Sequence, residues 1–185
     1  MNETVLHIVF AVLVILVAGT QMYFRRGRKA HDGVRIEERG IWMAVGLWVA
    51  SLCVYPLGFE WFDQKIALPE WTKWMGLAGM AMSIPLSVWV YASLGEYFSA
   101  RLELRSDHMI VTSGPYRFVR HPMYAVLFLC AIGATLASAN MIIAIASATL
   151  ITAMSLRIKK EESMLVQHFG ASYERYMQYT GSPGG

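Results

Sequence analysis

Charged residues are scarce in this chain. Asp, Glu, Lys and Arg make up 16% of its 185 residues, whereas soluble domains carry about 25% charged and about 45–50% apolar residues. Here 56% of the residues are hydrophobic and the mean hydropathy is +0.41. This composition excludes an ordinary soluble domain and indicates a polytopic membrane protein.

Cysteines and the motifs of soluble enzymes are also rare or missing. The two cysteines, Cys53 and Cys130, lie inside apolar stretches without CxxC or metal-ligand spacing, which is typical of small core residues. The sequence has no GxGxxG, P-loop, HExxH or GxSxG pattern, so a nucleotide-like cofactor would have to be held without a Rossmann turn. The five histidines include no pair at i, i+4 spacing, and we therefore expect no metal site.

Long apolar segments are abundant instead. A transmembrane helix needs about 20 mostly apolar residues, and five segments approach that length: 5–24, 41–59, 74–92, 122–139 and 141–156. The first segment lacks a basic start and a clear cleavage site, so we expect a retained helix and not a signal peptide. Only Asn140 separates the last two segments, which predicts a tight helical hairpin.

Polar residues follow the hairpin in a regular pattern. Leu165, Phe169, Tyr173 and Tyr176 recur at three- and four-residue steps, which predicts an amphipathic helix at the membrane interface. The expected fold is all-α: a polytopic membrane bundle with five transmembrane helices, a hairpin and a C-terminal interfacial helix.

Lys and Arg are distributed unevenly among the polar segments. Residues 25–40 hold six, 93–121 four and 157–185 four, against two in the acidic-leaning 60–73. The basic run at 25–40 could be a nucleic-acid patch. Because it directly follows an apolar span, we favour a cytoplasmic topology signal that touches anionic lipid, and expect no nucleic-acid partner. The positive-inside rule then predicts an N-terminus outside and the three most basic segments in the cytoplasm.

The segment 114–124, GPYRFVRHPMY, is unusually polar for the boundary of an apolar run. It could be an interfacial anchor in which Arg117 and Arg120 face lipid headgroups. It could also form a ligand site, because Pro122 suits the first position of a helix. His121 would then lie beside backbone N–H groups that favour a carboxylate. Spacing alone leaves both interpretations open.

A second polar group follows the hairpin. Arg157 and Glu161 are four residues apart, which a simple salt bridge along the helix would explain. The hairpin, however, should bring the end of the fifth helix next to the beginning of the fourth. Arg157 and Glu161 could then face His121 and Tyr124, and such a convergence of charges, an aromatic ring and a helix N-terminus is typical of a binding site.

Two segments of the chain resemble a known family. Residues 101–124, RLELRSDHMIVTSGPYRFVRHPMY, resemble the cofactor-binding region of the isoprenylcysteine carboxyl methyltransferases and their phospholipid methyltransferase relatives. Residues 157–176, RIKKEESMLVQHFGASYERY, resemble the second signature of that family. The resemblance implies a membrane-embedded methyltransferase that uses S-adenosyl-L-methionine. It also divides the expected single membrane domain, 1–185, into N-terminal transmembrane helices (1–92) and a cofactor-binding catalytic region (93–185).

The resemblance further implies roles for individual residues. Arg157 and Glu161 would be catalytic, with Arg157 facing the carboxylate of the acceptor. Position 101 is Arg, where some members of the family have Gln. The implied cofactor-binding residues are His108, Met109, Ile110, Val111, Tyr116, His121, Pro122, Met123, Tyr124 and Glu161.

The nature of the acceptor is open at this point. A carboxylate or thiolate attacks a sulfonium methyl without a general base, and alignment of two reactants can contribute roughly 7–11 kcal/mol. An amine must first lose a proton, for which His108, His121 or Glu162 would be available. We favour a lipophilic acceptor from the bilayer with a carboxylate, such as a prenylcysteine or an isoprenoid acid.

Several alternatives remain beside this favoured function. They are a lipid-amine or thiol methyltransferase, a sterol-reductase-like oxidoreductase that uses NADPH and has a similar RHPxY region, and a non-enzymatic membrane scaffold. Binding of S-adenosylhomocysteine or of NADPH separates these possibilities. The chain resembles prokaryotic proteins in its compactness, so we expect it in a prokaryotic cytoplasmic membrane with the catalytic side facing the cytoplasm.

The topology is testable without a ligand. In a background with both native cysteines replaced, a cysteine at Asn2 or Gln64 should react with an impermeant reagent added outside the cell, because the positive-inside rule places these positions there. A cysteine at Ser113 or Ser172 should react only after the membrane is opened. The reverse pattern of labelling would contradict the predicted orientation.

Overall fold

The computed structural model describes residues 2–25, 39–94 and 113–180, and within these ranges the regular structure is helical apart from one β-bridge between Lys65 and Asn140. The short 3₁₀ helices are η1 (Tyr55–Leu57), η2 (Glu60–Phe62) and η4 (Gly114–Arg117). The α-helices are α1 (Glu3–Arg25), α2 (Arg39–Val54), α3 (Glu70–Leu94), α4 (Pro122–Ser138), α5 (Met141–Phe169) and α6 (Ala171–Tyr179).

The predicted membrane bundle is confirmed. Four helices (α1, α2 with η1, α3 and α5) are long and apolar enough to cross a bilayer, and the apolar α4 is shorter, with 17 residues. Large hydrophobic side chains such as Ile8, Ile15, Met43 and Ile145 point outward with 59% to 73% of their surface exposed, as expected where lipid is the solvent. The chain is an integral, multi-pass membrane protein.

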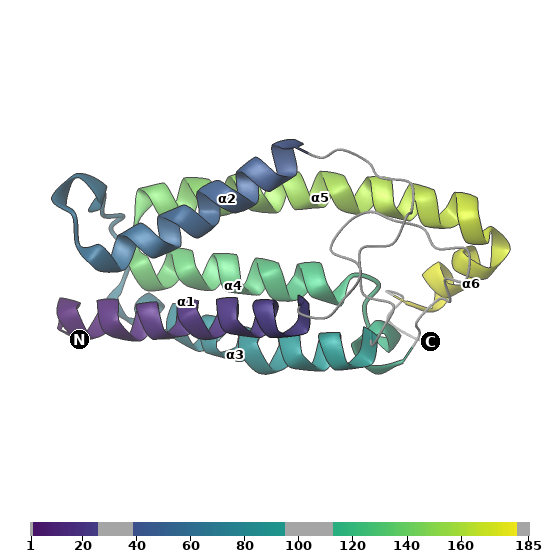
Figure 1. Cartoon of the computed structure of the whole chain (residues 1–185), viewed down its shortest axis with the longest axis horizontal. Coiled ribbons are helices and arrows are strands. Elements are labelled where there is room, and N and C mark those ends of the chain that lie inside the picture. The colour runs from purple at the N-terminus through teal and green to yellow at the C-terminus, as the bar shows by residue number, and fades with distance from the viewer. Residues whose placement is uncertain (1, 26–38, 95–112, 181–185) are drawn as a thin grey trace.

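The long helices lie side by side, and α4 is at the centre of the bundle, between α5 and the α1–α3 pair (Figure 1). The N-terminus, η1, η2 and the α4–α5 turn lie at one end, and η4 and α6 lie at the other (Figure 1). A salt bridge of 2.8 Å between Lys65 Nζ and Glu3 Oε1 joins α1 to the segment after η2. Of the predicted polar segments, residues 60–73 therefore lie at one end, and the described residues 113–121 and 157–180 lie at the other, whereas most of 25–40 and 93–112 lie outside the described residues.

The closest helix contact, between α3 and α4, depends on small residues. A Cβ atom added to Gly76 would lie 2.2 Å from the backbone nitrogen of Ala137, and one added to Gly133 would lie 2.8 Å from the Gly76 carbonyl oxygen. On α4, Ala131, Ala134 and Ala137 have no exposed surface. Because lipid offers little hydrophobic driving force between helices, such close backbone packing is a main source of association energy.

The predicted hairpin has a turn of two residues. Ala139 adopts a left-handed conformation with φ of 47°, and its N–H donates to the Thr135 carbonyl at 2.9 Å, which ends α4. The buried Asn140 side chain then caps α5, because its Oδ1 accepts from the N–H groups of Ile142 and Ile143 at 2.9 and 3.2 Å. Its Nδ2 donates to the Phe62 carbonyl at 2.7 Å.

The end of α5 differs from the prediction. The helix continues from residue 156 to Phe169, so residues 157–179 form the last turns of α5 and a separate α6. Residues 157–169 contain no glycine or proline, and a helix propagates through such a sequence once it has formed. The first break is Gly170, whose φ of 52° and ψ of −131° suit glycine.

The α3–α4 contact gives a matched pair of substitutions. Gly76→Ala should lower the melting temperature of the detergent-solubilised protein by several degrees or prevent folding, because the added methyl group meets the α4 backbone. Gly79→Ala, one turn later, should be nearly neutral, since its nearest neighbour is 3.6 Å away. Equal melting temperatures for both variants would contradict this packing.

Candidate functional site

The beginning of α4 and the last turns of α5 meet at the end of the bundle that also holds η4 and α6. Pro122 is the first residue of α4 and is buried, and His121 precedes it as the N-cap without capping the helix through its side chain. Pro122 has no N–H group, and the Ala125 N–H donates to the His121 carbonyl at 3.1 Å. Such a helix end, with its positive dipole, favours an anionic group.

Two adjacent glutamates of α5 bind different residues of the 114–124 segment. The Tyr124 hydroxyl donates to Glu161 Oε2 at 2.8 Å. Glu162 Oε1 lies 3.1 Å from His121 Nε2 and 3.5 Å from Arg120 Nε. Glu162 thus anchors the start of α4, and Glu161 is held by a neutral phenol with its charge uncompensated by that partner.

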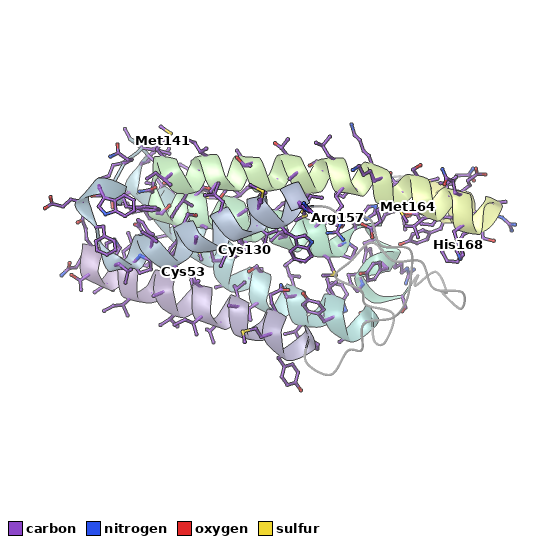
Figure 2. The ribbon with its side chains drawn as sticks, turned by 45° about the horizontal axis from the view of Figure 1, so that its top comes forward. Cys53, Cys130, Met141, Arg157, Met164 and His168 are labelled. Carbon is purple, nitrogen blue, oxygen red and sulfur yellow. The ribbon has the colours of Figure 1, made fainter. Side chains whose placement is uncertain are left out.

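Arg157 lies one helical turn before Glu161. Its exposed fraction is 7%, and it is the one charged residue that is buried among those described in residues 2–25, 39–94 and 113–180. Figure 2 shows that it lies deeper in the bundle than Met164 and His168, which follow it along α5. A buried guanidinium in a membrane protein is costly, which makes Arg157 a candidate site residue.

Tyr116 of η4 lies at the edge of this group. Burial raises the pKa of its phenol, and the nearby Glu161 carboxylate adds to the increase. The Tyr116 side chain is therefore a neutral hydrogen-bonding group at physiological pH. Its backbone carbonyl accepts from the Tyr176 hydroxyl of α6 at 2.7 Å.

The hairpin brings Tyr124 to Glu161, as expected from the sequence, whereas His121 contacts Glu162. Of the other expected residues, Tyr116 lies in η4, Pro122 and Met123 lie in the first turn of α4, and Arg157 lies on α5. The expected cofactor residues His108, Met109, Ile110 and Val111 lie outside the described residues.

Sequence reasoning missed two contacts. It proposed Glu162 only as a base, although Glu162 binds His121 and Arg120, and it assigned Tyr176 only to an amphipathic face. The adjacent glutamates were a usable signal for the first, because neighbouring positions on a helix point in different directions. No sequence pattern predicted the second, since it joins residues that are 60 positions apart.

The group of side chains fits an amino-acid nucleoside cofactor. Glu161 can accept from an ammonium or from ribose hydroxyls, while the N–H groups at the beginning of α4 can bind a carboxylate. Tyr116, Tyr124 and His121 add neutral or aromatic surface, and the His121 and Tyr124 rings are 5.8 Å apart. The ammonium and the carboxylate of the amino-acid part of such a molecule thus each find a partner of opposite sign.

Comparison with known proteins covers the same part of the chain. The isoprenylcysteine carboxyl methyltransferase (ICMT) family matches residues 74–167, which include α4 and most of α5. The protein-S-isoprenylcysteine O-methyltransferase of Schizosaccharomyces pombe is 42% identical over 71 residues, 38% of this chain and 30% of the relative. That of Tribolium castaneum is 34% identical over 132 residues, 66% of this chain and 47% of the relative.

A longer match at lower identity supports the assignment. The probable protein-S-isoprenylcysteine O-methyltransferase of Oryza sativa subsp. indica is 27% identical over 153 residues, 76% of this chain and 80% of the relative. The matched stretches of the Schizosaccharomyces and Dictyostelium enzymes cover only 30% and 36% of their lengths. Since the family match spans residues 74–167, half of the chain, the predicted family is confirmed: this protein belongs to the isoprenylcysteine carboxyl methyltransferase family.

Proposed function

We propose that the protein is a membrane methyltransferase that transfers a methyl group to a lipophilic acceptor carrying a carboxylate. S-adenosyl-L-methionine is the methyl donor of the family and, when bound, supplies an electrophilic methyl group on a sulfonium. The observation that carries the proposal is the pairing of Glu161 with Tyr124 beside the beginning of α4, one turn from the buried Arg157.

Glu161 and the beginning of α4 are the proposed donor site. The Tyr124 hydroxyl holds one oxygen of the Glu161 carboxylate and leaves the other able to accept from the donor. The positive end of the α4 dipole would attract the carboxylate of the donor, and Glu162 holds His121 beside it. These contacts would hold the amino-acid part of the donor and thereby restrict the direction of its reacting group.

Arg157 is the proposed acceptor site. Its guanidinium can hold a carboxylate with two parallel hydrogen bonds, which fixes the plane of the acceptor and aims one oxygen at the methyl group. The carboxylate is already ionised and needs no base, so Arg157 contributes orientation and desolvation. Burial strengthens the interaction, because the local dielectric is lower than in water.

Orientation and location form a finer part of the proposal. The site end carries Arg117, Arg120, Lys159, Lys160 and Arg175, whereas the opposite end carries Glu3, Glu60, Asp63 and Glu70 with two lysines. This asymmetry supports a site that faces the cytoplasm. We place the protein in the cytoplasmic membrane of a prokaryote, where a water-soluble donor reaches this side.

Donor binding tests the function directly. S-adenosylhomocysteine should raise the melting temperature of the purified protein in a saturable manner, because a ligand that binds the folded state stabilises it. NADPH should have no effect. A shift with NADPH alone would support the reductase alternative, and no shift with either molecule would support the scaffold.

The role of Glu161 has a matched control. Glu161→Gln should weaken S-adenosylhomocysteine binding by about tenfold or more, since charged hydrogen bonds contribute about 1.5–3 kcal/mol. Glu174→Gln removes the same charge from an exposed position of α6 and should leave the affinity unchanged. Calorimetric titration measures both, and equal affinities for the two variants would exclude Glu161 as a donor ligand.

Arg157 is tested by comparing acceptors. Arg157→Lys keeps the positive charge but loses the planar guanidinium that can form two parallel hydrogen bonds with a carboxylate. It should therefore reduce turnover of a prenylcysteine-type acid far more than it weakens binding of the methyl donor. Arg157→Ala should nearly abolish that turnover, while activity with an amine or a thiol should fall little. Equal losses with all three acceptor classes would show that Arg157 shapes the donor site instead.

A further inference from the structure

The helix α6 is hydrogen-bonded to the segment that contains residues proposed to bind the methyl donor. The Tyr176 hydroxyl donates to the backbone carbonyl of Tyr116 at 2.7 Å. The neighbouring Tyr173 is 3% exposed, and its ring centroid lies 5.8 Å from that of Tyr176. Burial raises the pKa of the Tyr173 phenol, and the Glu162 carboxylate adds to the increase.

Gly170 sets the direction of α6. Its φ of 52° and ψ of −131° lie in a region that side chains exclude. Its carbonyl accepts from the N–H groups of Tyr173 and Glu174, both at 3.1 Å. Figure 1 shows α6 turning back from the far end of α5 at this point. One backbone conformation therefore determines whether Tyr176 reaches η4.

The other side of η4 is held by α3. Gly114 has φ of 60°, and a Cβ atom there would lie 2.2 Å from Ser93 Oγ. The segment thus lies against the end of α3 at Gly114 and is bonded to α6 at Tyr116. Among residues 2–25, 39–94 and 113–180, the backbone bonds of η4 end on the carbonyls of Ser113 and Pro115, and the Tyr116 carbonyl accepts from the Tyr176 hydroxyl.

We propose that Tyr176 is a positioning residue for the methyl donor. Its hydroxyl holds the backbone of Tyr116 and so keeps η4 and the following His121–Tyr124 segment in the geometry that binds the donor. The inference rests on the proposed function. It assigns Tyr176 to donor affinity and not to the transfer step, because its hydroxyl is directed at a backbone carbonyl.

Two tyrosines of the same helix provide the test. Tyr176→Phe keeps the ring and removes the hydrogen bond, whereas Tyr179→Phe removes a hydroxyl from a residue that is 72% exposed. Tyr176→Phe should raise the Kd for S-adenosylhomocysteine roughly three- to tenfold, the range that a hydrogen bond of ordinary strength gives. The KM for the donor should rise in parallel, while kcat at saturating donor stays within about twofold.

A second variant reaches the same contact through the backbone. Gly170→Ala keeps the Tyr176 and Tyr179 side chains but disfavours the backbone conformation that directs α6 toward η4. It should also raise the Kd for S-adenosylhomocysteine, and Tyr179→Phe should match the wild type in Kd, KM and kcat.

The outcomes separate the two proposals. If the wild-type protein does not bind S-adenosylhomocysteine, the proposed function fails and this inference fails with it. If the wild type binds and Tyr176→Phe has the same Kd as Tyr179→Phe, only the role of Tyr176 is overturned. A lower melting temperature of unliganded Tyr176→Phe with an unchanged Kd would assign the hydrogen bond to folding alone, which also overturns the inference.

Discussion

The amide of Asn140 satisfies hydrogen-bonding groups at a point where the chain reverses inside a membrane protein. It accepts from two N–H groups at the beginning of α5 and donates to the Phe62 carbonyl. Buried backbone groups without partners are costly, so this side chain permits a turn of two residues. A turn this short keeps α4 and α5 antiparallel and adjacent, and that geometry places Tyr124 opposite Glu161.

The bundle and part of the site were predictable because they depend on local patterns. Apolar segment lengths predicted the helices, and the single polar residue between two of them predicted the hairpin. The hairpin in turn predicted that Glu161 would approach Tyr124. The partners of Glu162 and the extension of α5 to Phe169 depend on helix rotation and on the backbone of Gly170, which hydropathy does not report.

The site contains few groups that could act as acids or bases, which agrees with the proposed chemistry. Glu162 is engaged by His121 and Arg120, and the phenols of Tyr116 and Tyr173 have raised pKa values. These residues are suited to holding the chain and its ligands in position. A displacement between an ionised oxygen and a sulfonium requires alignment of the two reactants more than proton transfer. The polar residues can therefore serve to position the reactants.

The length of α5 has a consequence for the two reactants, which prefer opposite environments. The helix has 29 residues and is therefore about 44 Å long, longer than the hydrocarbon core of roughly 30 Å. Arg157 lies one turn nearer the middle of α5 than Glu161, a step of about 6 Å along the axis. Under the proposed assignment, an oily acceptor keeps its tail dissolved in the membrane while the polar donor stays in the aqueous layer. Because both proposed binding positions lie on the same helix, the two reactants can meet while the acceptor stays in lipid and the donor stays in water.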